Sequence, residues 1–148
     1  MAQETMQAFM PPNGMIEMFT FKVVSDQSIE KIAQNVPAEC EKNKFSLLHS
    51  YHYHEILESK GFPIKRKAFI YEIYQAKLAS KMLTTHPEFS IFMPCKIAIY
   101  ENEGKTIIST MNMEMMLKSV QDNEELYNEA IALFNTLNSL MASLKNIE

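Results

Sequence analysis

The fold of this chain is decided by residues 95–111, which read CKIAIYENEGKTIISTM. Two apolar runs, over 95–100 and 106–111, flank the polar sequence Glu-Asn-Glu-Gly. Such a pattern is typical of two antiparallel strands joined by a tight turn. Gly104 supplies the positive φ that the turn requires. We therefore predict a β-hairpin across these residues.

Three more strands are predicted upstream of the hairpin, over residues 18–24, 45–51 and 68–74. The first alternates between apolar and polar positions, as a half-buried strand does. One face carries Phe19, Phe21 and Val23, and the other carries Met18, Thr20 and Lys22. The third is rich in aromatic and β-branched residues, which strands favour.

Helices are predicted between these strands because apolar residues there recur at helical spacing. The first helix follows a cap at Ser25 or Asp26 and contains Pro37. Proline removes one backbone donor, so we expect a kink at that point. Shorter helices are predicted over 52–60 and 75–85.

A long C-terminal helix is predicted over residues 122–145, after a cap at Asp122 or Asn123. Its apolar residues step by four and three alternately: Leu126, Ala130, Leu133, Leu137, Leu140 and Leu144. We expect this stripe to pack on the sheet, since each element has one apolar face to bury. Phe19, Phe21, Ile97, Ile99, Leu133 and Leu137 are therefore predicted to be buried.

The apolar stripe of this helix is wider than one sheet contact requires. The surplus comes from Tyr127, Ile131, Phe134 and Met141, next to Met113, Met115 and Met116. Large exposed apolar patches usually mark interfaces, and a two-fold dimer would cover this one. We therefore predict a homodimer.

Length and composition indicate one globular domain. The chain has 148 residues, of which 47% are hydrophobic and 22% charged. Residues 1–15 are predicted to be a flexible N-terminal arm, and residues 16–148 a single α+β domain. No apolar run reaches the roughly 20 residues that cross a bilayer, so membrane insertion is not expected.

The charge balance argues against nucleic acid as a partner. The formal net charge is −4, and the single basic run, Lys65 to Lys67, is typical of a solvated loop. Residues 2–4, Ala-Gln-Glu, follow Met1 as they would in an exported protein whose signal peptide was replaced by a start codon. The compartment is then periplasmic; otherwise it is cytoplasmic.

Several blocks resemble the bacterial family known as domain of unknown function 302. They read LLH at 47–49, EILESKG at 55–61, IYEI at 70–73 and FMPCKIAIYE at 92–101, with Gly-Lys at 104–105. The Pro-Cys pair that opens a strand is the most specific of these. The resemblance implies a two-layer fold with helices on one side of a mainly antiparallel sheet, similar to TATA-binding-protein-like folds. A shared fold does not by itself imply a function.

One departure from the family pattern matters for chemistry. Many members have a glutamate and a cysteine two residues apart at the end of the third strand, followed by Asn-Pro. Here the glutamate is Glu72, but Tyr74 holds the cysteine position and Gln75-Ala76 follows it. Paired-thiol chemistry between that position and Cys95 is therefore not expected.

Cys95, Glu72 and His49 are the candidate catalytic residues. A reactive thiolate needs a basic neighbour, which His49 would supply if its strand lay adjacent. Glu72 alone raises rather than lowers a thiol pKa. The alternative is a packed, inert Cys95. Glu72 shares a strand face with Ala68 and Ile70, so we expect it to be half-buried.

The candidate metal ligands lie among three histidines within six residues, and a metal ion or haem is the chemistry they would hold. His52 and Glu55, at i and i+3, would share a helix edge, with His49 as a further candidate. No single face collects all three histidines, which favours surface or cap roles. Met111, Met113, Met115 and Met116 offer thioethers that select Cu(I), although methionine is also a common core filler.

Two functions remain at this point. The first is a non-catalytic module that binds a small ligand, a metal centre or a protein partner. The second is an enzyme that uses Cys95 or Glu72 in a cleft at the strand ends. The first is favoured because no complete catalytic set is visible.

Overall fold

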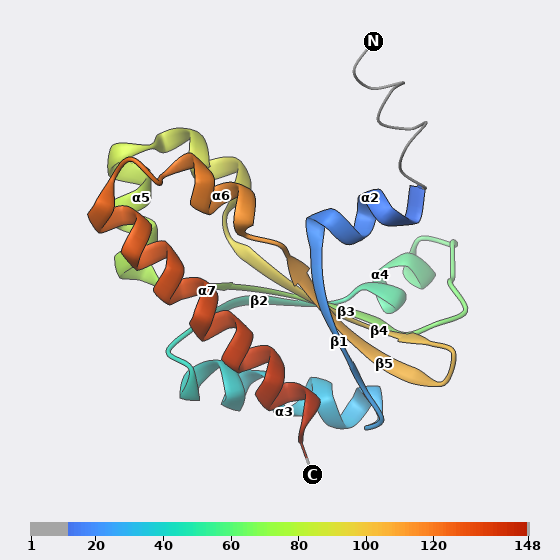
Figure 1. Cartoon of the computed structure of the whole chain (residues 1–148). Helices are drawn as coiled ribbons and strands as arrows, with labels where there is room; N and C mark the ends of the chain where they lie inside the picture. The colour runs from blue at the N-terminus through green and yellow to red at the C-terminus, as the bar shows by residue number, and fades with distance from the viewer. Residues whose placement is uncertain (1–11, 148) are drawn as a thin grey trace.

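The computed structural model describes residues 12–147 (Figure 1). Its elements follow the predicted order, with additional short helices. They are α2 (Pro12–Phe19), β1 (Thr20–Ser25), α3 (Ile29–Lys42), β2 (Ser46–His52), α4 (Tyr53–Ser59), β3 (Ala68–Tyr74), α5 (Ala76–Thr85), the 3₁₀ helix η1 (Pro87–Phe92), β4 (Cys95–Asn102), β5 (Lys105–Met111), α6 (Glu114–Ser119) and α7 (Glu124–Lys145). The predicted arm covers residues 1–15. Residues 1–11 lie outside the described part of the chain, and residues 12–15 form the start of α2.

The five strands form one sheet in the order β1-β5-β4-β3-β2, and every neighbouring pair is antiparallel. The predicted hairpin is confirmed as β4 and β5, with positive φ at Glu103 and Gly104. Figure 1 shows the sheet nearly edge-on, with α3, α5, α6 and α7 on one side and α2 and α4 on the other. The α+β class and the antiparallel sheet beneath a long C-terminal helix are therefore confirmed.

The core lies between the sheet and the helices α3, α5 and α7. The inner face of the sheet is the one toward these helices, and Ile73, Ile97, Ile99 and Ile108 on it are all fully buried. The predicted α7 stripe is buried against them: Leu126, Ala130, Leu133, Leu137, Leu140 and Leu144. No helix in residues 12–147 is long and apolar enough to span a membrane.

The predicted core residues are confirmed, with Phe19 as the exception. Ile97, Ile99, Leu133 and Leu137 are buried, and Phe21 is half-buried. Phe19 is 45% exposed, so its predicted burial is wrong. The reason is local: residue 19 is the last residue of α2, and the strand alternation begins only at residue 20.

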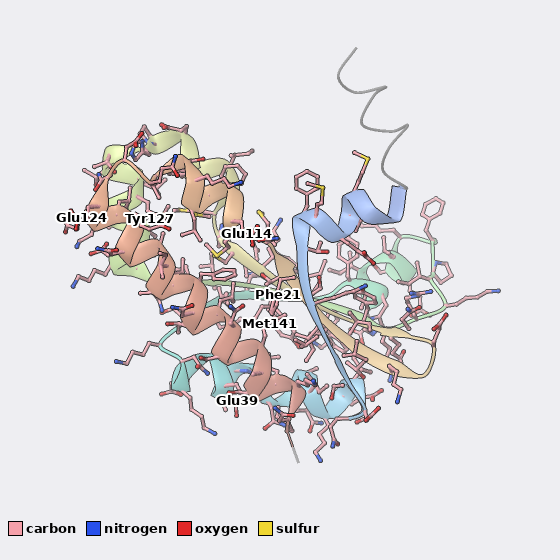
Figure 2. All side chains as sticks on the ribbon, viewed as in Figure 1. Phe21, Glu39, Glu114, Glu124, Tyr127 and Met141 are labelled. Atoms are coloured by element: carbon pink, nitrogen blue, oxygen red, sulfur yellow. The ribbon has the colours of Figure 1, made fainter. Side chains whose placement is uncertain are left out.

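The surplus apolar surface expected on α7 is smaller than predicted. Met141 is fully buried and Met113 is 3% exposed, so both belong to the core of a single chain. In Figure 2, Phe21 and Met141 lie between β1 and α7, whereas Glu114 and Glu124 lie at the outer surface. Tyr127, Ile131 and Phe134 are half-buried. Part of the apolar patch from which the homodimer was predicted is therefore buried within a single chain, and the homodimer stays a prediction.

Helix α3 runs through Pro37, which lacks the backbone N–H that would bond to the carbonyl of Ala33. The hydroxyl of Tyr71 donates to that carbonyl oxygen across 3.4 Å. Tyr71 is buried on the inner face of β3, and burial raises its pKa to about 12. A side chain of the central sheet thus occupies the acceptor that the proline leaves free.

The end of β1 is fastened to the end of α7. The Oγ of Ser25 donates to the carbonyl oxygen of Lys145 at 2.9 Å, and the Oγ1 of Thr106 donates to the carbonyl oxygen of Gln27 at 2.7 Å. Ser25 and Thr106 are buried, so both hydroxyls need these partners. Segments 120 residues apart in sequence therefore meet at one corner of the fold.

Candidate functional site

Cys95 is the first residue of β4, directly after Pro94, and its side chain points to the inner face of the sheet. It pairs in register with Ile73, which is fully buried on that face. Beside it is a cavity of about 380 Å³. Residues of α5, η1, α6 and α7 form most of its walls, together with the ends of β2, β3 and β4. The lining includes Leu78, Met82, Phe92, Cys95, Met116 and Leu133.

The cavity is almost entirely apolar. Leu78, Met82 and Leu133 are themselves core residues, with 7%, 1% and 7% exposure. Oxygen or nitrogen atoms on lining side chains come only from Tyr74, Gln75 and Ser90 among the residues described. Small-molecule sites share this composition, with apolar walls and a few polar groups that fix orientation.

The thiol of Cys95 is free and half-buried. Burial in apolar surroundings raises its pKa, because the charged thiolate is poorly solvated there. The second cysteine, Cys40, is buried in α3, where burial raises its pKa to about 11. Both thiols are therefore protonated near neutral pH, which disfavours nucleophilic attack.

Glu72 and His49 lie on the other face of the sheet, called here the open face. They pair in register with each other on β3 and β2, while Lys96 pairs with Glu72 from β4. The strands of His49 and Cys95 are not adjacent, because β3 lies between β2 and β4, and Cys95 projects to the opposite side of the sheet.

Glu72 is half-buried, in agreement with the expectation from its strand face. The hydroxyl of Tyr51 donates to its Oε1 at 2.6 Å. This hydrogen bond raises the pKa of Tyr51, because the phenol must stay protonated to donate. The carboxylate of Glu72 therefore has a partner on its own face of the sheet.

The candidate metal ligands are only partly brought together. The Nδ1 of His52 lies 3.3 Å from Oε2 of Glu55, and both side chains are more than half exposed. His49 lies on the open face instead. Within residues 12–147 no group of three or more histidine, cysteine, aspartate or glutamate side chains is placed to hold a metal ion.

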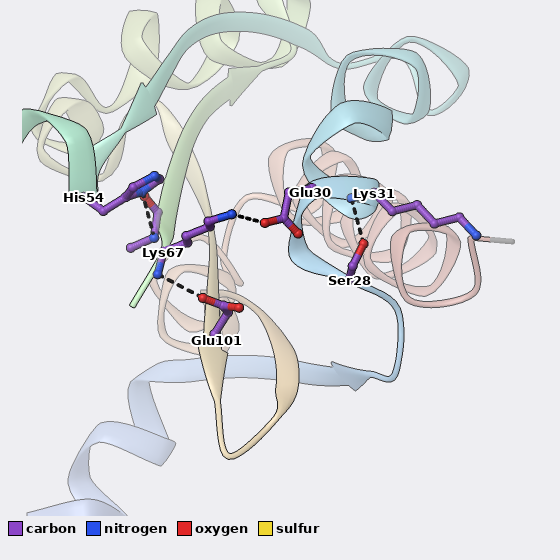
Figure 3. Close-up of polar contacts among 7 residues, drawn as sticks. Ser28, Glu30, Lys31, His54, Lys67 and Glu101 are labelled. Carbon is purple, nitrogen blue, oxygen red and sulfur yellow. Dashed lines mark hydrogen bonds and ion pairs between the residues drawn. The ribbon is translucent and has the colours of Figure 1, made fainter. Parts of the chain in front are cut away.

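His54 has a structural contact at the start of β3. Its Nδ1 lies 3.1 Å from both the backbone nitrogen and the carbonyl oxygen of Ala68 (Figure 3). The next residue back, Lys67, donates its backbone N–H to Glu101 at 3.1 Å and pairs through Nζ with Glu30. These contacts hold the strand end in place, and they account for one histidine of the cluster.

The methionines near the C-terminal end of β5 occupy different environments. Met111 is 46% exposed at the end of the strand, and Met113 is 3% exposed in the core. Met116 lines the cavity, where Met82 and Met93 join it. Met111 and Met113, although two residues apart, therefore lie in different environments and do not share one surface.

The chain matches the family described as "Domain of unknown function DUF302" over residues 21–144. It belongs to the DUF302 family. A solved structure from Bacillus stearothermophilus, titled as an uncharacterized conserved DUF302 protein, resembles it with a TM-score of 0.72 and 22% sequence identity. The match covers 84% of this chain and 97% of that one. No curated protein matches this sequence.

The cavity of this DUF302 domain was not found by sequence reasoning. Its lining residues are scattered from Leu48 to Leu133, and most are apolar residue types that are equally common in an ordinary core. The one available signal was the Pro-Cys pair at 94–95, which lies at the edge of the cavity.

Proposed function

We propose that this DUF302 domain is a non-catalytic module that binds a small apolar ligand in the cavity beside Cys95. The observation that carries the proposal is the cavity itself, about 380 Å³ in volume and apolar on nearly every side. This volume falls within the roughly 300–1,000 Å³ of small-molecule sites. A ligand there would gain free energy mainly from removing apolar surface from water.

The electrostatics support binding over catalysis. The raised pKa of the Cys95 thiol keeps it in its less nucleophilic form at neutral pH. The candidate base His49 and the carboxylate of Glu72 both lie on the open face, away from the thiol. The cavity therefore lacks, among the residues described, the acid or base that would complete a thiol-dependent site.

Fluorescence titration with N-phenyl-1-naphthylamine, a neutral apolar probe, tests the proposal. We expect saturable binding to the unmodified protein. Ala79→Phe should weaken binding by about 10-fold or more, because Ala79 lines the cavity and the larger ring would occupy it. Ala142→Phe is the matched control, since Ala142 is exposed on α7 and outside the cavity.

Circular dichroism would establish that both variants are folded. No saturable binding to the unmodified protein would refute the proposal. Equal binding by a folded Ala79→Phe variant would also refute it, because the probe would then occupy another place.

The alternative function is an enzyme that uses Cys95 or Glu72, and it draws support from the position of Cys95 on the cavity wall. Alkylation by iodoacetamide at pH 7 discriminates between the two. We expect slow modification, and Cys95→Ser should leave probe binding within a few-fold of the unmodified protein. Rapid alkylation of the folded protein at Cys95 would favour the enzyme.

We further propose a homodimer in which a second copy covers α2 and the edge strand β1. The supporting observation is the exposure of Ile16 (65%), Met18 (48%) and Val24 (45%) along these elements. Static light scattering should report a dimer at high micromolar concentration and a folded monomer for Val24→Glu. Ile91→Glu, at an 82% exposed residue of η1, is the control. An unmodified protein that is monomeric at this concentration excludes the dimer.

A further inference from the structure

Lys96 follows Cys95 in β4 and therefore projects to the open face, above a second hollow of about 590 Å³. This outer hollow is mainly apolar, with walls that include Phe19, Ala98 and Met111. The ammonium group of Lys96 thus stands at the edge of an apolar surface, on the far side of the sheet from the thiol.

The outer hollow and the inner cavity adjoin each other at the start of β4. A smaller hollow of about 80 Å³ lies beside both and is lined by Cys95 and Lys96 together. Phe92 and Met116 line all three spaces. Phe92 is 41% exposed, so these two side chains form a thin partition rather than a layer of core.

The positive charge at this boundary has no close partner in residues 12–147. Lys96 has no ion pair among the residues described, although Glu72 is its neighbour across the β3–β4 register. Glu72 instead accepts the hydroxyl of Tyr51. Neither the outer hollow nor the small one has an acidic side chain on its walls in the described part of the chain.

We propose that the ligand of this domain is a single-chain amphiphile with an anionic head, such as a fatty carboxylate. The inference rests on the proposed function and names its ligand class. The tail lies in the inner cavity beside Cys95, and the chain passes Phe92 and Met116. The carboxylate meets the ammonium group of Lys96 at the edge of the outer hollow, where water still solvates both charges.

The size of the inner cavity agrees with such a tail. At the packing density of protein interiors, about 0.74, a cavity of 380 Å³ holds roughly 280 Å³ of ligand atoms, or an alkyl chain of about 12 to 16 carbons. A neutral chain of the same length would gain the same free energy from burial. Lys96 therefore distinguishes ligands by the charge of their head groups.

Competition against N-phenyl-1-naphthylamine tests the inference with three ligands that share a twelve-carbon chain: dodecanol, dodecanoate and dodecyltrimethylammonium, each below its micelle concentration. Lys96→Glu should weaken dodecanoate binding by about 10-fold and strengthen binding of the cation, because an exposed charge pair contributes on the order of 1 kcal/mol and reversal adds repulsion. Dodecanol binding should change by less than about 2-fold, since it has no charge to sense.

Lys65→Glu provides the matched control, because it makes the same change in net charge in the exposed loop at 60–67, which borders none of the three hollows. It should leave the affinities for all three ligands unchanged. If dodecanol binds but Lys96→Glu does not alter the preference among the heads, the amphiphile inference fails and the apolar site stands. If dodecanol does not bind at all, both fail.

Discussion

The two faces of the sheet are built from alternate residues of the same strands, yet they differ in almost every property. On β3, Phe69, Tyr71 and Ile73 point inward and are buried, while Ile70 and Glu72 point outward and are half-buried. The inner face is closed by α3, α5 and α7. The open face has a hydrogen-bonded carboxylate, a hollow, and a lysine without an ion pair among residues 12–147. Stability is therefore expected from one face and selectivity for charge from the other.

Truncation of an isoleucine on each face tests this comparison most strongly. Ile97→Ala should lower the free energy of unfolding by about 3 kcal/mol, because it leaves a cavity in the packed inner layer. Ile70→Ala on the open face should cost about 1 kcal/mol, since Ile70 is only half-buried. Urea denaturation measures both. Equal losses would mean that the open face is covered in solution, for example by a second copy.

Alkaline pH should lower the free energy of unfolding by roughly 3 kcal/mol between pH 8 and pH 10.5. Burial raises the pKa of Cys40 from 9.0 to about 11 and that of Tyr71 from 10.0 to about 12. The unfolded chain loses these protons first. The stability they contribute is thus complete below pH 9 and is lost progressively as pH rises through 11 and 12.

The control for this pH dependence is Cys40→Ala. It should remove the fall in free energy of unfolding that begins near pH 9. The fall that begins near pH 10, which comes from Tyr71, should remain. Urea denaturation at half-unit steps from pH 8 to 10.5 resolves the two. A free energy of unfolding that stays constant over this range would contradict the inward placement of both groups.

Removing one hydroxyl from each face sharpens the comparison further. Tyr71→Phe should cost about 1 kcal/mol, since the carbonyl of Ala33 would lose its donor in a partly buried position. Tyr51→Phe should cost less, because water can replace the phenol at Glu72 on the half-exposed open face. Thermal unfolding of the two variants gives the order, and the reverse order would count against this description of the faces.

The smallest effect is expected outside both faces. Lys67→Gln removes the ion pair with Glu30, in which both side chains are nearly half exposed. Exposed ion pairs contribute little to stability, so we expect the smallest loss in free energy of unfolding among these variants, further reduced at high salt. Lys65→Gln, in the same exposed loop, is the control. A loss as large as that of Tyr71→Phe would show that the start of β3 contributes strongly to stability.

The fold was largely predictable because its signals are local. The alternation in 18–24, the turn at Gly104 and the leucine stripe of α7 are each visible in one short stretch of sequence. Phe19 was misplaced because the same alternation extends by chance into the last residue of α2. Periodicity alone does not show at which residue strand pairing begins, because the extent of the partner strand decides that.

The candidate site was harder to predict, since it depends on pairing and on empty space. The strand face of Glu72 could be predicted from the alternation of its own strand. Whether Cys95 lies on the same face of the sheet could not, because that depends on the register between β3 and β4. A cavity has no sequence signal of its own, because its walls have the composition of core. The contact between His52 and Glu55 followed from helix spacing alone, and it was predicted.

The bond between Ser25 and Lys145 has a consequence for the order in which the molecule can be made. A hydrogen bond joins β1, the first strand of the sheet, to the last turn of α7. Residues that are far apart in sequence must therefore meet before the core is closed. Folding that depends on such distant contacts is slow compared with helix formation. On the ribosome the apolar inner face must wait until α7 has emerged before it is shielded from water.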